Sequence, residues 1–139
     1  METDSGFEKS WKRGHLSNSS SQRFAAIAGS ILIGLIALVL FASAVAKFAK
    51  APFVVSPLAA DGFAGQRLLA IAVMEFLSAL LFLVPRTRSL GLLLISSYMG
   101  GAIATHLGHD QSIVQPAVVL ALAWVGVWLR HREVVWSFS

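Results

Sequence analysis

Cysteine is absent from this 139-residue chain. Its absence excludes disulfide exchange, thiol nucleophiles and cysteine-ligated metal clusters within the chain. Charged residues are also scarce, at 13%, and only seven of them are acidic. The sequence shows no nucleophile–base pair and no cofactor motif, so a self-contained enzyme is the least supported class of function and no catalytic residue is assigned.

Apolar residues take the place of the missing charges. Hydrophobic residues make up 56% of the chain, and the mean hydropathy is +0.73. A membrane-spanning helix needs about 17–25 apolar residues, and a strand span would need alternating patterns of about ten residues. The sequence therefore predicts an all-α fold, a polytopic membrane four-helix bundle. Its four apolar runs are Phe24–Ala46, Leu68–Val84, Leu90–Leu107 and Ile113–Leu129.

The sequence divides into a membrane domain and two tails. Residues 1–23 mix charges with a run of serines, a composition that buries little apolar surface, so a disordered amino-terminal tail is expected. Residues 24–132 form the four-helix transmembrane domain, and residues 133–139 form a short second tail. Ala44-Val45-Ala46 resembles a signal-peptide cleavage site. The apolar run before it is too long for a signal peptide, however, and Lys47 follows directly.

The basic residues are distributed unevenly between the two sides of the expected membrane. Eight lie on the side of the termini and three on the other. This positive-inside bias predicts cytoplasmic termini and accounts for the net charge of +4 without nucleic acid. The predicted partner is thus the lipid bilayer. The eight are Lys9, Lys12, Arg13, Arg23, Arg86, Arg88, Arg130 and Arg132, and the three are Lys47, Lys50 and Arg67.

Glu75 stands alone inside the second apolar run. A carboxylate at membrane depth is costly unless it is compensated, so it is a candidate functional residue. We expect it to face the bundle interior, with Lys47, Arg67 or His106 as its polar partner. The expected ligand-binding or buried polar cluster lies in the outer half of the membrane and comprises Ser43, Lys47, Arg67, Glu75, Ser78 and His106, with Gln115 contributed by the fourth helix.

Each member of this cluster also has a plainer interpretation. Lys47 can extend to the outer headgroups, and Glu75 can be protonated or serve as a structural polar lock. His106 can cap the carbonyl end of its helix. The pattern His106-x-x-His109-Asp110 makes His109 a weak metal candidate, but a fourth ligand is missing and no metal site is assigned.

Small and aromatic residues predict how the helices pack. Ser97, Gly101 and Thr105 recur every four residues, as do Ser96, Gly100 and Ala104. Such small residues allow close helix approach in membranes, so the third run is expected to be the central helix and to pack on the second through Ser97, Gly101 or the Gly100 face. Trp124 and Trp128 indicate an aromatic belt, with a stacking site for a ring ligand as the alternative.

Several segments, in order, resemble the DoxX-like family of small four-helix membrane proteins. The resemblance runs from about Leu38 to Arg132 and rests on Ala44-Val45-Ala46-Lys47-Phe48, Ala72-Val73-Met74-Glu75-Phe76-Leu77, Leu83-Val84-Pro85-Arg86-Thr87-Arg88-Ser89-Leu90-Gly91 and Gly100-Gly101-Ala102-Ile103-Ala104-Thr105-His106-Leu107. It implies that Lys47, Glu75 and His106 occupy the family's polar positions. Ala72 departs from the pattern, because glycine is frequent there.

The resemblance also implies a bacterial inner-membrane location and an association with redox or stress-response systems. Two functions are open. In the first, the chain is a non-catalytic membrane subunit or a binder of a small lipophilic, quinone-like ligand, and its partners are redox protein subunits or a second copy of itself. In the second, it is a small transporter or proton-conducting element that uses Glu75 and His106. An apolar bundle with a few convergent polar groups favours the first. The lack of an inverted repeat counts against a secondary transporter.

Overall fold

The computed structural model describes the backbone of residues 4–130 and the side chains of residues 21–130, and this part of the chain consists of α-helices joined by short loops. The four long helices match the four expected spans to within a few residues, apart from the start of the first. The second tail expected at residues 133–139 lies outside the described residues. The helices are α1 Asp4–Phe48, α2 Pro52–Ala60, α3 Gln66–Leu83, α4 Arg88–Gly108 and α5 Val114–Arg130.

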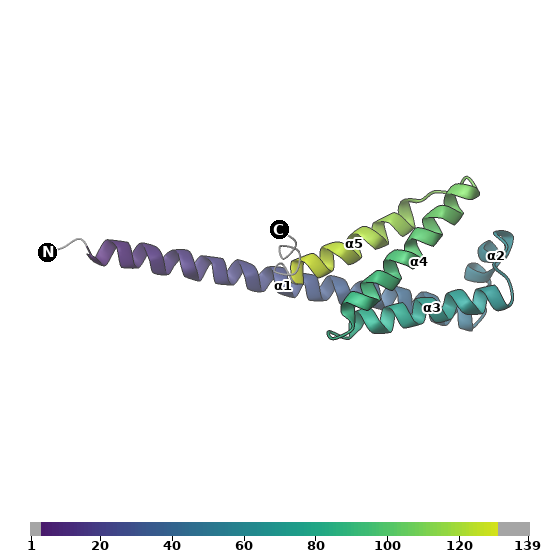
Figure 1. Cartoon of the computed structure of the whole chain (residues 1–139), viewed down its shortest axis with the longest axis horizontal. Coiled ribbons are helices and arrows are strands. Elements are labelled where there is room, and N and C mark those ends of the chain that lie inside the picture. The colour runs from purple at the N-terminus through teal and green to yellow at the C-terminus, as the bar shows by residue number, and fades with distance from the viewer. Residues whose placement is uncertain (1–3, 131–139) are drawn as a thin grey trace.

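Helix α1 is much longer than the sequence predicts. It begins at Asp4, so residues 4–23, expected to be disordered, continue the first span as helix and project beyond the bundle (Figure 1). The expectation rested on the lack of burial, but a helix that is already nucleated extends by one hydrogen bond per residue without burying anything. The four prolines of the chain all lie after residue 51, so none interrupts this extension.

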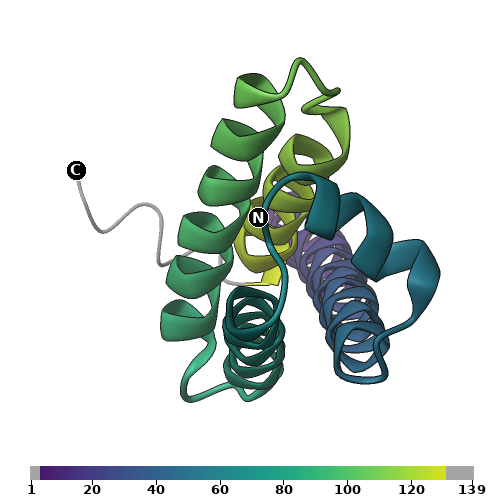
Figure 2. The same cartoon turned by 90° about the vertical axis from the view of Figure 1, so that its right-hand side faces the viewer.

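The four long helices form a ring in which chain neighbours run in opposite directions. Helix α1 packs against α3 and α5, and α4 packs against the same two helices (Figure 2). The buried core lies in the half of the bundle nearer the α3–α4 turn and is apolar. It includes Ile33, Ile36, Leu40, Ala79, Phe82, Leu92, Ile95 and Ala123.

The close helix contacts fall at glycines other than the expected ones. A Cβ at Gly91 would collide with the backbone of Phe82, and one at Gly29 would lie 2.7 Å from the carbonyl oxygen of Gly126. A Cβ at Gly100 or Gly101 would meet nothing within 4 Å. Ser97 is exposed as well. The expectation that α4 is central and packs through Ser97, Gly101 or the Gly100 face is therefore wrong. Small residues permit close approach, but they do not bring a neighbouring helix to their face.

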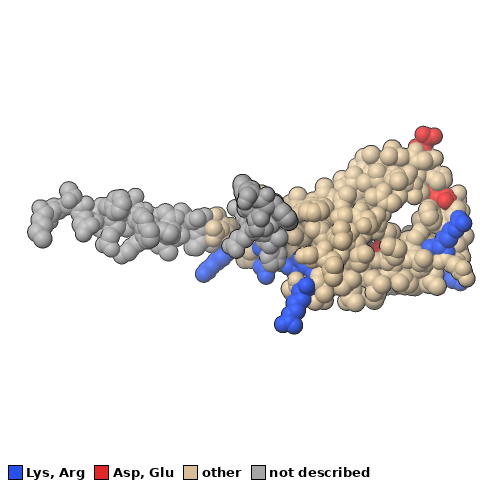
Figure 3. All heavy atoms as spheres, viewed as in Figure 1, with Lys and Arg blue, Asp and Glu red and all other residues tan. Residues whose placement is uncertain are grey.

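Within the described residues, three helices are long and apolar enough to cross a membrane: residues 21–48 of α1, α3 and α4. Helix α5 is equally apolar, but its 17 residues extend only about 26 Å against a hydrocarbon core of ~30 Å. Large apolar side chains on the outside of the bundle, such as Phe24 at 73% and Leu93 at 62% exposure, suit contact with lipid. In Figure 3 the Lys and Arg side chains gather towards the two ends of the described part, with few charged side chains between them.

Three helices end in the same way on the side of the bundle that carries α2. Lys50, Gly62 and Asp110 adopt positive φ values of 53°, 85° and 53° just after α1, α2 and α4. In each case the next amide hydrogen-bonds to a carbonyl five residues back, as from Ala51 to Ala46 at 2.9 Å and from Gln111 to His106 at 2.8 Å. These are Schellman ends, which satisfy the last helical carbonyls. They fix the loops around the site described next.

Candidate functional site

A buried ion pair joins α1 to α3. The Nζ of Lys47 lies 2.6 Å from Oε2 of Glu75, and the two side chains are only 5% and 3% exposed. Lys47 stands in the last turn of α1, and Ser43, one turn earlier, accepts a second hydrogen bond from Nζ at 2.7 Å. Of the three partners considered for Glu75, the structure selects Lys47. Lys47 therefore does not extend to the headgroups.

Tyr98, on α4, brings a third helix to this ion pair. The sequence analysis did not identify Tyr98 as a site residue. Its hydroxyl is hydrogen-bonded to the carboxylate of Glu75. A carboxylate can accept from several donors at once, so Glu75 is compensated by both an ammonium and a hydroxyl. The available signal was that Tyr98 is the only tyrosine of the chain and lies within an apolar run.

These groups line a cavity of about 350 Å³ at the end of the bundle that carries α2. All five helices contribute to its wall, and the space-filling view shows an opening at this end (Figure 3). Its polar lining is Ser43, Lys47, Glu75, Tyr98, His106 and Gln115, and the rest is apolar, including Phe53, Leu58, Met99 and Val119. The cavity thus combines one concentrated polar wall with an apolar remainder, as small-molecule sites commonly do.

His106 faces this cavity from the last turn of α4. Its Nδ1 lies 2.7 Å from the backbone oxygen of Ser112 in the α4–α5 loop. A carbonyl oxygen only accepts, so Nδ1 must carry a proton, and in the neutral ring Nε2 is an acceptor. His106 thus anchors the following loop rather than capping its own helix, and its second nitrogen remains available for a ligand.

The other residues expected at the site lie elsewhere. Arg67 is exposed at the start of α3, and its Nη1 donates to the oxygen of Gly62 at 3.3 Å. Ser78 is fully buried and donates to the carbonyl of Met74 at 2.6 Å. It does not line the cavity. His109 is exposed and bonds through Nδ1 to the oxygen of Thr105. Within residues 21–130 no group of three metal-ligating side chains occurs.

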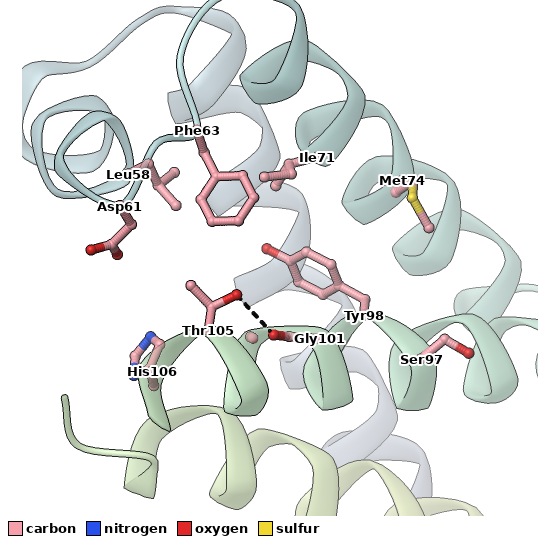
Figure 4. A pocket seen from close by; sticks show the side chains of 11 residues that line it. Leu58, Asp61, Phe63, Ile71, Met74, Ser97, Tyr98, Gly101, Thr105 and His106 are labelled. Carbon is pink, nitrogen blue, oxygen red and sulfur yellow. Dashed lines mark hydrogen bonds between the residues drawn. The ribbon is translucent and has the colours of Figure 1, made fainter. Parts of the chain in front are cut away.

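A second cavity of about 290 Å³ adjoins the first between α3 and α4. Figure 4 shows Tyr98 and His106 on its floor and Phe63, Ile71 and Met74 on the facing side. The two cavities share Leu58, Tyr98, Ala102 and His106. The first is polar at the ion pair, whereas the second is lined mainly by apolar groups.

The donors and acceptors of the first cavity suit a ligand that carries carbonyl or hydroxyl oxygens. An ammonium has three N–H donors, and Ser43 and Glu75 occupy two of those of Lys47. Among the contacts of the described residues, the third N–H of Lys47 has no acceptor. It can therefore donate to a ligand oxygen in the cavity that Lys47 lines. Nε2 of neutral His106 can accept from a hydroxyl on the same ligand.

Residues 31–126 match the model of the DoxX-like family. The chain belongs to the DoxX-like family. The matched segment holds Ser43, Lys47, Glu75, Tyr98 and His106, and covers α1 from residue 31 to most of α5. No curated protein and no solved structure matches the chain.

Proposed function

We propose that this DoxX-like membrane protein binds a small lipophilic ligand of the quinone class in the cavity between its five helices. It acts as a binding subunit rather than as an enzyme on its own. The observation that carries the proposal is that the buried Lys47–Glu75 pair borders a cavity instead of being packed shut.

Energetics supports a ligand role for this pair. Removing two charges from water costs several kcal/mol per ion, and a buried pair is often no more stabilising than apolar side chains of similar volume. A bundle with an otherwise apolar core gains little stability from such a pair. The third N–H of Lys47 can donate a charge-assisted hydrogen bond to the carbonyl oxygen of a bound ligand, which apolar residues cannot do.

The size and polarity of the cavity favour a ligand headgroup with one or two rings. Ligand pockets typically enclose about 300–1,000 Å³ and combine apolar walls with a few placed polar groups. A quinone offers carbonyl oxygens for Lys47, and its reduced form offers a hydroxyl for Nε2 of His106. Phe53, Leu58 and Val119 provide apolar contacts for the ring faces.

The proton-conducting alternative has less support. Beyond Ser78, the core towards the α3–α4 turn consists of apolar side chains such as Ala79, Phe82 and Ile95. Among the described residues, this apolar layer separates the ion pair from the end of the bundle that carries the α3–α4 turn. A proton path would need a chain of polar groups or water across it.

The test is binding of a tail-less dimethoxy-methyl benzoquinone and its quinol to the purified protein in lipid nanodiscs. A ligand that binds only the folded state raises the melting temperature by an amount that grows with the logarithm of its concentration divided by its Kd. We expect a dose-dependent rise for the wild type. The double variant Lys47→Met with Glu75→Met, which leaves no orphaned charge, should bind about 10- to 100-fold more weakly, since a hydrogen bond to a charged donor is lost.

Arg67→Gln is the matched control, because Arg67 lies on the same side of the molecule but lines neither cavity. It should bind like the wild type. Equal binding by the double variant and the wild type would overturn the proposal. So would proton flux into vesicles that depends on Glu75 in a protein that binds no quinone, since that result favours the conducting element.

A further inference from the structure

The second cavity lies beside the first and differs from it in chemistry. Its lining from α3 and the α2–α3 segment is Asp61, Phe63, Ile71 and Met74, and α4 contributes Ser97, Gly101 and Thr105 besides the residues shared with the first cavity. Asp61 accepts a hydrogen bond from Gln111 at 2.9 Å. The hydroxyls of Ser97 and Thr105 are turned back to helix carbonyls, at 3.1 Å and 3.0 Å. They are therefore satisfied within α4, and the cavity offers a ligand mostly apolar contact.

The helix geometry explains why this cavity is open. Helices α3 and α4 touch most closely at Phe82 and Gly91, next to their shared turn. From there they separate towards the end that carries α2 (Figure 1). Met74, Ser97 and Gly101 are exposed on the outside of the bundle as well as lining the cavity. The space between the helices thus leads from the polar cavity to the lipid-facing surface.

We propose that this second cavity holds the apolar tail of the ligand whose ring occupies the first, and that Gly101 sets how much tail it admits. The inference rests on the proposed function. It narrows the ligand class to amphiphiles that have an oxygen-bearing ring and an alkyl or isoprenoid tail and that enter sideways from the membrane. The observation that carries it is that the two cavities adjoin and share Leu58, Tyr98, Ala102 and His106 in their linings.

Gly101 is the position where the chain can be altered without disturbing its packing. A Cβ there would meet nothing within 4 Å, so the missing side chain serves no helix contact. What the glycine leaves is volume in the cavity. Gly100 offers a matched control, since it is equally open to a Cβ but lines neither cavity.

The experiment compares two probes, the tail-less benzoquinone and the same ring with a decyl tail, on the wild type, Gly101→Leu and Gly100→Leu in nanodiscs. Affinity is measured by ligand-dependent melting temperature. Gly101→Leu should weaken the tailed probe by about tenfold or more, because several buried methylenes lose their contacts, and should leave the tail-less probe within about twofold. Gly100→Leu should bind both probes like the wild type.

The outcomes separate the two proposals. If the wild type does not bind the tail-less ring, the proposed function fails. If it binds the ring, but Gly101→Leu weakens both probes equally or neither, the tail assignment fails. Ser97→Leu narrows the same cavity one turn earlier along α4. It should repeat the selective loss if Gly101→Leu does not fold, and its failure to do so would overturn the inference.

Discussion

At the residue scale, the candidate site is built around a buried ion pair between α1 and α3. Lys47 and Glu75 are each almost fully buried, and each satisfies the other at 2.6 Å. Either charge alone would be left uncompensated in a low-dielectric interior. Ser43 and Tyr98 add the hydrogen bonds that hold the ammonium and carboxylate in place. The pair is thus a unit, and its members cannot be judged one at a time.

A double-mutant cycle tests this unit. Lys47→Met strands a buried carboxylate and should destabilise the protein by about 3–5 kcal/mol. Glu75→Met strands the ammonium, and we expect a similar loss. The double variant should recover most of the stability, because no unpaired charge remains. Reversible unfolding in mild detergent measures all three. Additive losses in the double variant would contradict the coupling.

At the element scale, the divergence of α3 and α4 creates the second cavity. The two helices are held together at Gly91 and by the hydrogen bonds of their turn, from Thr87 to the carbonyl of Leu81 at 3.0 Å and from Arg88 to that of Phe82 at 3.3 Å. Farther along α4, Gly100 and Gly101 face open space. One helix pair therefore serves both packing, near its turn, and cavity formation, at its far end.

Gly91→Ala is the substitution that tests the close contact. The new methyl would collide with the backbone of Phe82, and overpacking of this kind costs about 1–3 kcal/mol. We expect a lower melting temperature in detergent. Gly100→Ala, on the same helix but open to a Cβ, should melt within about a degree of the wild type. Equal melting of both variants would show that the contact at Gly91 is not needed.

At the scale of the whole molecule, the two ends differ in charge and in structure. The end with the α3–α4 turn carries Arg23, Arg86, Arg88 and Arg130, and the other carries α2, Lys50, Arg67 and the acidic residues Asp61 and Asp110 (Figure 3). Gln111 donates to Asp61 at 2.9 Å, which ties the α2–α3 segment to the α4–α5 loop. The candidate site opens towards this second end.

The charge distribution predicts orientation. The basic end should face the cytoplasm, because positively charged loops are retained there. A reporter active only in the cytoplasm should be active when fused after Glu133 and inactive when inserted near Asp61, and a periplasmic reporter should give the reverse. A carboxyl terminus found outside would overturn the proposed topology and place the candidate site on the cytoplasmic side.

The sequence by itself determined the membrane character, the four long helices and the inward orientation of Glu75. Hydropathy fixes spans because backbone hydrogen bonds within lipid must be satisfied inside each helix. A single carboxylate in such a span must find a polar partner. The sequence therefore predicted its burial and limited its partner to Lys47, Arg67 or His106.

Only the tertiary structure decided which residues meet. Lys47 rather than Arg67 reaches Glu75, because Lys47 stands in the last turn of α1, which packs on α3. Tyr98 joins them through α4, a contact between residues far apart in the chain that no local pattern reveals. Gly91 rather than Gly101 became the packing glycine, since helix crossing points depend on how all the ridges fit and not on a motif in one helix.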